Sequence, residues 1–213
     1  MALLDSPRLV AMFNAISNAM SADKDRLCAL DGVIGDVDRG IAMELGFNAV
    51  RQALSQIDVS ATEPTAVFNL AAKSFLNAVG ASSGPLYATA FMRAGVAVKS
   101  KQQLSDSDIV AVMQAMAKGI QDRGKAEPGE KTMIDVWHPA SPAIGTAFSA
   151  GHSLVECLDA ALSAAKEGAE ATKGMTATKG RAARLGERSL GHMDPGAASA
   201  VSIIAAMQAS LID

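Results

Sequence analysis

Apolar residues recur at helical spacing along most of this chain. The first stretch opens at Ser6-Pro7, a cap-and-proline pair typical of a helix start. Its apolar positions follow the pattern i, i+3, i+4, i+7 and i+11 at Leu9, Met12, Phe13, Ile16 and Met20. This period predicts a helix with one buried face, and we expect a second, short helix from about Asp25 to Asp31.

Further helices, each with a single apolar face, are expected through the middle of the chain. Pro64 after Thr62-Glu63 marks one start, and Ser105 with Asp108 resembles a capping box in which Asp replaces the usual Glu. The apolar positions of these helices are Met43, Phe47, Val50 and Leu54; Val67, Ala71, Phe75 and Ala78; Leu86, Ala90, Ala94 and Val98; and Ile109, Val112, Met113, Met116 and Ile120. Each helix would bury one face against its neighbours.

The last third of the chain continues the helical pattern. Thr132 with Asp135 can cap one helix, and a long helix follows from Gly151. Asp194-Pro195 supplies an N-cap and a first-turn proline for an almost wholly apolar helix over 196–212. No stretch alternates with a period of two residues, and no Rossmann or Walker pattern is present. The sequence therefore predicts an all-α fold, an antiparallel up-and-down barrel or bundle of about eight helices.

Length, composition and charge narrow this picture. The 213 residues suffice for a single domain with its own core, over residues 1–213. With 49% apolar residues and only 4% aromatics, that core is expected to consist of Ala, Leu, Ile, Val and Met. A net charge of -3 without a long basic run gives no reason to expect nucleic acid or an anionic membrane surface as a partner. The start lacks a secretory signal and no apolar run reaches spanning length, so we expect a cytoplasmic protein.

The stretch from Asp31 to Gly40 carries the most distinctive chemistry. Asp31, Asp36 and Asp38 place three carboxylates in eight residues beside Gly35. On a continuous helix Asp36 would point away from the other two, so convergence requires the chain to turn near Gly35. Hard oxygen ligands at this density suit magnesium, which also accepts phosphate oxygens. Aspartate is common in turns and caps, so this stretch alone leaves a metal site and a structural turn as alternatives.

Other loops contain candidate groups for binding an anion. The turn Gly80-Ala81-Ser82-Ser83-Gly84 runs into a helix whose N-terminus offers free N–H donors, although such a turn is more often structural. A charged loop follows at 122–132. Farther on, Arg181, Arg184 and Arg188 are interspersed with glycines, and they either reach a phosphate or form a solvated basic segment. In an antiparallel bundle these loops and the acidic turn would gather at one end, as the parts of a metal-nucleotide site.

These stretches together resemble the nucleotide-binding L subunit of dihydroxyacetone kinase. In chain order, the residues that carry the resemblance are Asp31 with Gly35-Asp36-Val37-Asp38-Arg39-Gly40; Ser83-Gly84-Pro85-Leu86; Arg123 to Met133; and Gly180-Arg181 through Gly186-Glu187-Arg188-Ser189 to Gly191-His192-Met193-Asp194-Pro195-Gly196-Ala197. The resemblance spans nearly the whole chain, and separate motifs in the right order make it more specific than any one of them. It implies an eight-helix barrel that binds ADP or ATP through two magnesium ions at one end.

The resemblance also implies roles for particular residues. The metal-binding aspartates of the family match Asp31, Asp36 and Asp38. Its nucleotide contacts fall on Arg39, Gly40, Ile41, Ala42, Ser82, Ser83, Gly124, Met133, Arg181, Asp194, Pro195 and Gly196. Among these, Arg181 is expected to be catalytic, because phosphoryl transfer needs charge neutralisation and positioning more than a protein nucleophile.

Members of the family work with partner proteins. The resemblance implies a separate K subunit, which holds the ketose covalently through a histidine and presents its hydroxyl to the terminal phosphate. In one branch the nucleotide stays bound as ADP and is recharged by a phosphohistidine M subunit of the phosphotransferase system; in the other, ATP exchanges as a substrate. The expected activity is that of a kinase subunit, active only with its K subunit, toward dihydroxyacetone or a related ketose.

The chain departs from the family pattern beside the metal aspartates. Arg39 stands where His or Thr is usual, Ala42 where a polar residue is expected, and Val37 where Gly or Ala is usual. A guanidinium beside the metals either replaces some of their charge on the phosphate or lowers metal affinity through repulsion. Arg39 therefore supports an alternative hypothesis, a nucleotide-binding regulatory or adaptor subunit without its own turnover.

Overall fold

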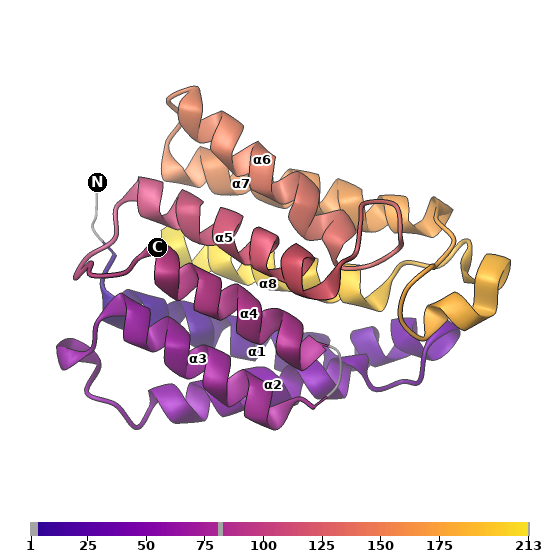
Figure 1. The fold of residues 1–213 in the computed structure, drawn as a ribbon, viewed down its shortest axis with the longest axis horizontal. Coiled ribbons are helices and arrows are strands. Elements are labelled where there is room, and N and C mark those ends of the chain that lie inside the picture. The colour runs from indigo at the N-terminus through magenta and orange to yellow at the C-terminus, as the bar shows by residue number, and fades with distance from the viewer. Residues whose placement is uncertain (1–3, 81–82, 213) are drawn as a thin grey trace.

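Residues 4–80 and 83–212 are described by the computed structural model, and in this part of the chain eight α-helices run alternately up and down (Figure 1). The helices are α1 (Ser6–Ile34), α2 (Arg39–Leu54), α3 (Pro64–Ala78), α4 (Ser83–Ala97), α5 (Asp106–Gly124), α6 (Ile134–Ser149), α7 (Leu154–Ala171) and α8 (Pro195–Ile212). Short 3-10 helices η1 (Val59–Ala61), η2 (Thr172–Gly174) and η3 (Ala182–Ser189) lie in the connections. Each α-helix packs against the next, and α1 packs against α8, so the helices close into a ring. The predicted all-α, up-and-down arrangement is confirmed.

Aromatic side chains crowd the core between α1 and α4, which the composition did not predict. Phe47 of α2 packs edge to face against Phe75, Tyr87 and Phe91, with ring centroids 5.1, 6.2 and 6.1 Å apart. A Cβ on Gly46 would lie 2.4 Å from the Phe75 ring, so the glycine at this position lets the ring reach the core. The expectation of a core made only of Ala, Leu, Ile, Val and Met is therefore incomplete, although these residues predominate in α5, α7 and α8.

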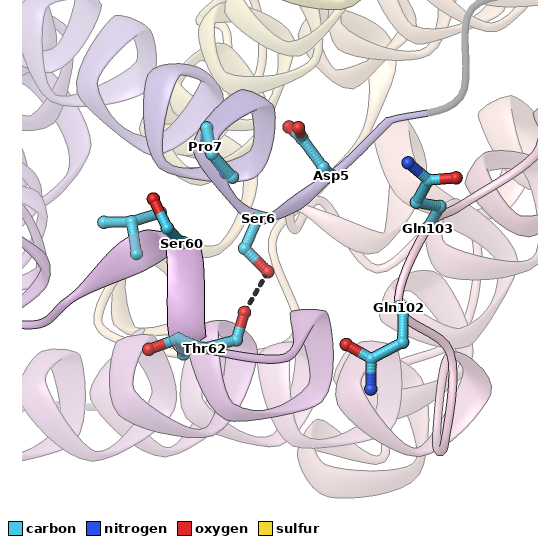
Figure 2. Close-up of a pocket in the computed structure, with 8 residues that line it drawn as sticks. Asp5, Ser6, Pro7, Ser60, Thr62, Gln102 and Gln103 are labelled. Atoms are coloured by element: carbon cyan, nitrogen blue, oxygen red, sulfur yellow. Dashed lines mark hydrogen bonds between the residues drawn. The ribbon is translucent and has the colours of Figure 1, made fainter.

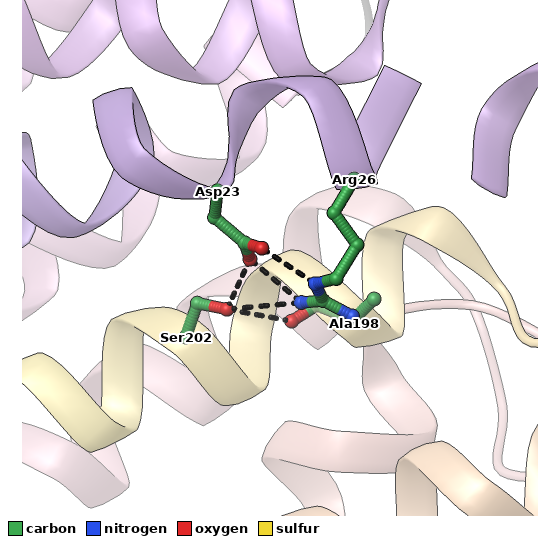
Figure 3. A network of polar contacts seen from close by, with 4 residues as sticks. All are labelled: Asp23, Arg26, Ala198 and Ser202. Carbon is green, nitrogen blue, oxygen red and sulfur yellow. Dashed lines mark hydrogen bonds and ion pairs between the residues drawn. The ribbon is translucent and has the colours of Figure 1, made fainter. Parts of the chain in front are cut away.

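The first helix differs from the prediction. α1 is one continuous helix of 29 residues, so the predicted separate helix from about Asp25 is wrong. The buried apolar stripe continues through Leu27 to Ile34, and the polar residues before it also gain partners. Arg26 donates to both oxygens of Asp23 at 2.5 and 2.6 Å, and Ser202 Oγ of α8 donates to Asp23 Oδ2 at 2.6 Å (Figure 3). These contacts keep the middle of α1 helical and attach it to α8.

The connections between helices fall at opposite ends of the ring. The site end, on the right in Figure 1, carries the turn 35–38, the end of α3, the start of α4, the loop 125–133 and the segment 172–194. The cap end carries the connections 55–63, 98–105 and 150–153. The loops predicted to gather at one end therefore do so.

At the cap end, a hollow of about 450 Å³ lies beside the start of α1. Ser6 Oγ donates to Thr62 O at 2.5 Å within it (Figure 2).

None of the helices in the described residues combines the length and apolarity that a membrane crossing requires.

Candidate functional site

The turn between α1 and α2 forms the centre of the candidate site. Gly35 ends α1, and α2 begins at Arg39. A Cβ on Gly35 would lie 2.1 Å from Asp31 Oδ1, and a Cβ on Gly40 would lie 2.0 Å from Lys24 O. Any larger residue at either position would clash with α1, so the two glycines allow the chain to turn back closely. The turn predicted near Gly35 is confirmed.

Three carboxylates converge on this turn. One oxygen from each of Asp31, Asp36 and Asp38 lies within 4.8 Å of the others. Asp31 is buried, and its Oδ2 accepts backbone hydrogen bonds from Asp38 N at 2.9 Å and Arg39 N at 3.2 Å. The side chains of Asp36 and Asp38 are 34% and 51% exposed. One fixed and two accessible carboxylates suit a magnesium ion that keeps some of its water and accepts phosphate oxygens, so these residues would hold the metal.

The turn contains a strained residue. Val37, between the two accessible aspartates, has a φ of 68°. This left-handed conformation is unfavourable for a β-branched side chain and costs about 1–2 kcal/mol. Glycine, one of the two residues expected here from the family resemblance, would adopt it freely. The strain therefore follows from one of the departures that the sequence showed.

Arg181 lies opposite the carboxylates, just before η3. Its guanidinium forms an ion pair with Asp36 and reaches Asp38 Oδ2 at 3.9 Å. The guanidinium offsets the repulsion between the carboxylates, and its 61% exposed side chain remains free to move. Arg184 and Arg188 lie on η3 with exposed side chains, which favours the solvated alternative for these two residues.

The guanidinium of Arg39 binds α8 rather than the carboxylates. Its Nε and Nη2 donate to Ser199 Oγ at 3.1 and 2.7 Å, and Ser199 Oγ donates to Gly196 O at 2.8 Å. This relay ties the first turn of α2 to the first turn of α8. The guanidinium of Arg39 therefore contacts Ser199, whereas its backbone N–H contacts Asp31.

The N-terminus of α8 brings together several residues predicted to bind the nucleotide. Asp194 Oδ2 accepts from Ala197 N at 2.7 Å, which confirms the predicted N-cap. A Cβ built on Gly196 would lie 3.5 Å from Met133 N and 3.7 Å from Arg39 Nη2. The N-terminal ends of α2, α6 and α8 thus meet at Gly196. Pro195 precedes it and is buried.

Burial of Asp194 shapes the electrostatics of this corner. Burial raises the pKa of Asp194 to about 6, although the Ala197 N–H, Arg39 and Lys131 act in the opposite direction and lower it. The like charge of Asp135 also raises the pKa of Asp194. The carboxyl group of Asp194 therefore takes up a proton at a pH closer to neutrality than an ordinary carboxyl group does.

Lys131 organises the loops at the site end, a role that the sequence did not indicate. Although it belongs to the charged loop at 122–132, Lys131 is only 1% exposed. The Nζ donates to Thr172 O and His192 O, each at 2.5 Å, and to Met175 O at 3.2 Å. Burial lowers the pKa of Lys131, which Asp194 partly opposes. One ammonium therefore joins the loop before α6 to both ends of the segment between α7 and α8.

Two buried polar atoms lie beneath the Arg39 relay. Among the described residues, Tyr87 Oη and Trp137 Nε1 have no hydrogen-bond partner. Burial raises the pKa of the Tyr87 hydroxyl, and Arg39, Trp137 and Ser199 are near enough to oppose this. Trp137 lies in the core. Such unpaired groups are costly and cluster at functional sites, but single tyrosine and tryptophan residues gave no signal in the sequence.

The remaining predicted residues are distributed around the site end. Ser83 is buried at the start of α4, and Ser82 lies outside the described residues. Gly124 ends α5, and a Cβ on it would lie 3.0 Å from Leu86 of α4. On α2, Ala42 is half-buried, whereas Ile41 is 52% exposed. Of these residues, the structure brings Ile41, Ala42, Ser83 and Gly124 to one end of the ring.

Comparison with known proteins agrees with this arrangement. Residues 33–209 match the DAK2 domain. The chain belongs to the DAK2 domain family. It is 37% identical, over 92% of both chains, to the ADP-binding subunit of PEP-dependent dihydroxyacetone kinase of Escherichia coli (strain K12). It is 38% identical, over 91% of both chains, to the ADP-binding subunit of PEP-dependent dihydroxyacetone kinase 1 of Listeria innocua.

A solved structure is similar as well. The dihydroxyacetone kinase of C. freundii, in complex with AMP-PNP and Mg2+, superposes with a TM-score of 0.72 at 26% identity. The match covers 95% of this chain and 34% of that chain, so it accounts for about a third of the C. freundii kinase. The family resemblance carried by the motifs is confirmed.

Proposed function

We propose that this DAK2 chain is the nucleotide-binding subunit of a multi-subunit dihydroxyacetone or related ketose kinase, with the ketose held on a separate K subunit. The observation that carries the proposal is the convergence of Asp31, Asp36 and Asp38 within 4.8 Å. The E. coli and L. innocua relatives are ADP-binding subunits of PEP-dependent kinases. We therefore favour the branch in which bound ADP is recharged by a phosphohistidine M subunit. A single cytoplasmic domain over residues 1–213 remains part of the proposal.

The residues of the site would divide the work of phosphoryl transfer. Asp31, Asp36 and Asp38 would hold two magnesium ions, which neutralise charge on the phosphates when bound. The other predicted contacts surround this centre: Arg39, Gly40, Ile41 and Ala42 on α2, Ser82 and Ser83 at α4, Gly124 after α5, Met133 before α6, and Asp194, Pro195 and Gly196 at α8. A Cβ on Gly196 would lie 2.8 Å from Asp194 Oδ2, so glycine at this position lets Asp194 cap α8.

Arg181 would act as the catalytic cation. In the structure its guanidinium is paired with Asp36 and lies near Asp38. With the carboxylates holding metal, the guanidinium of Arg181 would be available to bind and stabilise the transferred phosphoryl group. A positioned cation that stabilises charge developing in the transition state supplies much of the catalysis in such reactions, without a protein nucleophile.

The metal site is tested by Asp36→Asn. Calorimetric titration with ADP and Mg2+ should show affinity reduced at least about a hundredfold, because a metal ligand becomes a neutral amide. Asp58→Asn is the matched control, since Asp58 caps η1 at the cap end. Its ADP affinity should equal that of the wild type. ADP binding that survives complete removal of divalent cations by a chelator would contradict the proposal.

Turnover separates the kinase from an adaptor. The chain is mixed with a K subunit, dihydroxyacetone and either ATP or a phosphohistidine M subunit, and triose phosphate is measured. Formation of triose phosphate only with the M subunit, and ADP that resists dialysis, are the expected results. Tight nucleotide binding without any product, with every donor and ketose, would instead support the regulatory alternative.

A further inference from the structure

The ammonium of Lys131 closes the base of a long segment at the site end. Its Nζ donates to Met175 O at 3.2 Å and to His192 O at 2.5 Å. These two carbonyl groups directly flank residues 176–191, which carry Arg181 and which we call the arm. One buried side chain, in the loop that leads into α6, therefore holds the two ends of the arm together.

The chemistry of Lys131 suits this task. Thr172 O accepts a third hydrogen bond from Nζ, at 2.5 Å, so the three N–H donors of the ammonium meet three carbonyl acceptors. Because these donors are occupied and Lys131 is buried, its ammonium is not available to bind a phosphate. The backbone of Lys131 has a φ of 61°, a conformation that is uncommon for residues with a side chain and that clusters at functional sites.

The outer part of the arm, residues 180–188, has little support of its own. Apart from the ion pairs of Arg181, its hydrogen bonds within the described residues are local: Arg184 N donates to Arg181 O at 3.1 Å, and Ser189 Oγ donates to Gly186 O at 2.7 Å. These bonds shape the arm but do not fasten it to a helix of the ring. The placement of the outer part therefore depends on the base.

Arg181 and its partners come from different parts of the fold. Asp36 and Asp38 lie in the turn between α1 and α2, whereas Arg181 reaches them from the arm. An ion pair of a side chain that is 61% exposed contributes little to fixing such a segment. A catalytic group must nevertheless be placed accurately, because an error of about 1 Å can reduce the rate about a hundredfold. The accuracy has to come from the buried base of the arm.

We propose that Lys131 is a positioning residue for phosphoryl transfer: by holding Met175 and His192, its ammonium keeps Arg181 beside the metal carboxylates. The inference rests on the proposed function, in which Arg181 is the catalytic cation. It gives Lys131 a kinetic role that acts through Arg181, in addition to its contribution to stability. The competing reading is that Lys131 only stabilises the fold, and the two readings predict different kinetics.

A double-mutant cycle tests the proposal. The kcat for triose phosphate formation is measured with the K subunit and the phosphoryl donor that support turnover of the wild type. Lys131→Met should lower kcat at least about tenfold, and Arg181→Met at least about a hundredfold. The double variant should match Arg181→Met within about twofold, because no cation is left to position. A kcat lowered by the product of the two single effects would show that Lys131 acts independently, and would overturn the proposal.

Two further variants separate positioning from loss of stability. Leu9→Ala is the control, because Leu9 is completely buried in α1 near the cap end, and its truncation destabilises the fold far from the arm. At a temperature at which circular dichroism shows every variant folded, its kcat should equal that of the wild type. Lys131→Gln, which keeps two N–H donors, replaces Lys131→Met in the cycle if the latter does not fold. It should lower kcat at least about threefold, and not at all in the Arg181→Met background.

Hydrogen exchange measured by mass spectrometry gives a readout that does not depend on turnover. Amides of the arm should exchange at least about tenfold faster in the Lys131 variant than in the wild type, while those of the cap-end connection 98–105 keep their rates. Equal exchange of the arm in both proteins would overturn the proposal. Absence of turnover by the wild type with every donor would refute the proposed function, and the kinetic role of Lys131 with it. Turnover with independent effects of Lys131 and Arg181 would refute the positioning role alone.

Discussion

The two ends of the helical ring use charged and polar residues in opposite ways. At the cap end the charges are paired between residues close in sequence: Lys101 Nζ, on a side chain 44% exposed, binds Asp108 Oδ1 at 2.6 Å, and Ser105 N donates to Asp108 Oδ2 at 2.9 Å. At the site end Lys131 and Asp194 are buried, and they join segments distant in sequence. The polar residues of the cap end cap and connect helices, whereas those of the site end hold a binding site in place at a cost in stability.

The difference shows that the side chains at the site end are not arranged for the greatest stability of the fold. Within the described residues, the site end has three neighbouring carboxylates, a buried tyrosine hydroxyl and indole N–H without partners, and a strained valine. Each is unfavourable for folding alone. Their concentration at one end is what a ligand-binding site requires, because a ligand can compensate for groups that the fold leaves unpaired. Matched substitutions at the two ends should make this contrast measurable.

The largest contrast is expected between two lysines. Lys131→Met removes a buried ammonium that binds three backbone carbonyl groups, and should lower the free energy of unfolding by about 4 kcal/mol. Lys101→Met at the cap end removes an ion pair whose lysine side chain is 44% exposed, and should cost about 1 kcal/mol or less. Urea denaturation followed by circular dichroism measures both. Equal losses would show that the loops at the site end do not depend on Lys131.

The second contrast concerns pH. Burial raises the pKa of Asp194 from 3.8 to about 6. The native state therefore holds a proton that the unfolded state releases, so this contribution to stability is complete below the unfolded pKa and is lost as pH rises through the folded pKa. Burial also raises the pKa of Asp108, but the Lys101 and Ser105 donors outweigh it and the pKa falls below 3.8. The contribution of Asp108 is therefore present above its unfolded pKa and lost in acid.

Asparagine variants isolate these two contributions. The stability of the wild type relative to Asp194→Asn should fall by about 2 kcal/mol between pH 4 and pH 7. The stability of the wild type relative to Asp108→Asn should instead decrease when the pH is lowered below the pKa of the carboxyl group in the unfolded chain. Urea denaturation at several pH values measures both differences. A pH-independent difference for Asp194→Asn would mean that Arg39 and Lys131 keep its pKa close to the ordinary value.

The smallest contrast is between two residues with left-handed backbones. Val37→Gly relieves the strain of a β-branched residue at φ 68° and should raise stability by about 1 kcal/mol, after the greater freedom of glycine in the unfolded chain is deducted. Ser100→Gly, at φ 64° in the cap end, should gain about half as much, because serine is not β-branched. Thermal unfolding by calorimetry can resolve the difference. A loss of stability in Val37→Gly would show that its side-chain packing over α1 outweighs the strain.

Local patterns in the sequence were sufficient for most of the fold. The period of apolar residues located the helices, and the geometry of helices required the turn near Gly35. The error over α1 did not affect the convergence of the loops, because the turns at the site end are separated by even numbers of helices however α1 is divided. The break expected before Asp25 failed because Asp23 and Arg26 gain a partner in Ser202 of α8, far away in sequence.

The electrostatics of the site were less predictable for the same reason. Lys131 binds carbonyls 41 to 61 residues away, and Arg39 binds Ser199, 160 residues away. In a single sequence, Lys131 looks like any solvated lysine beside a Pro-Gly turn. The resemblance to a family located Arg39 at the site but not the direction of its guanidinium, because the family has a different residue there.

The continuous first helix has a consequence for how a kinase of this kind can be assembled as one polypeptide. α1 begins and α8 ends at the cap end, and the 29 residues of α1 extend for about 40 Å toward the metal turn. A second domain fused to either helix would be tethered at the far side of the ring from the phosphates. The tether would raise the local concentration of that domain but could not orient it, so covalent and separate partners would need the same surface to align the acceptor.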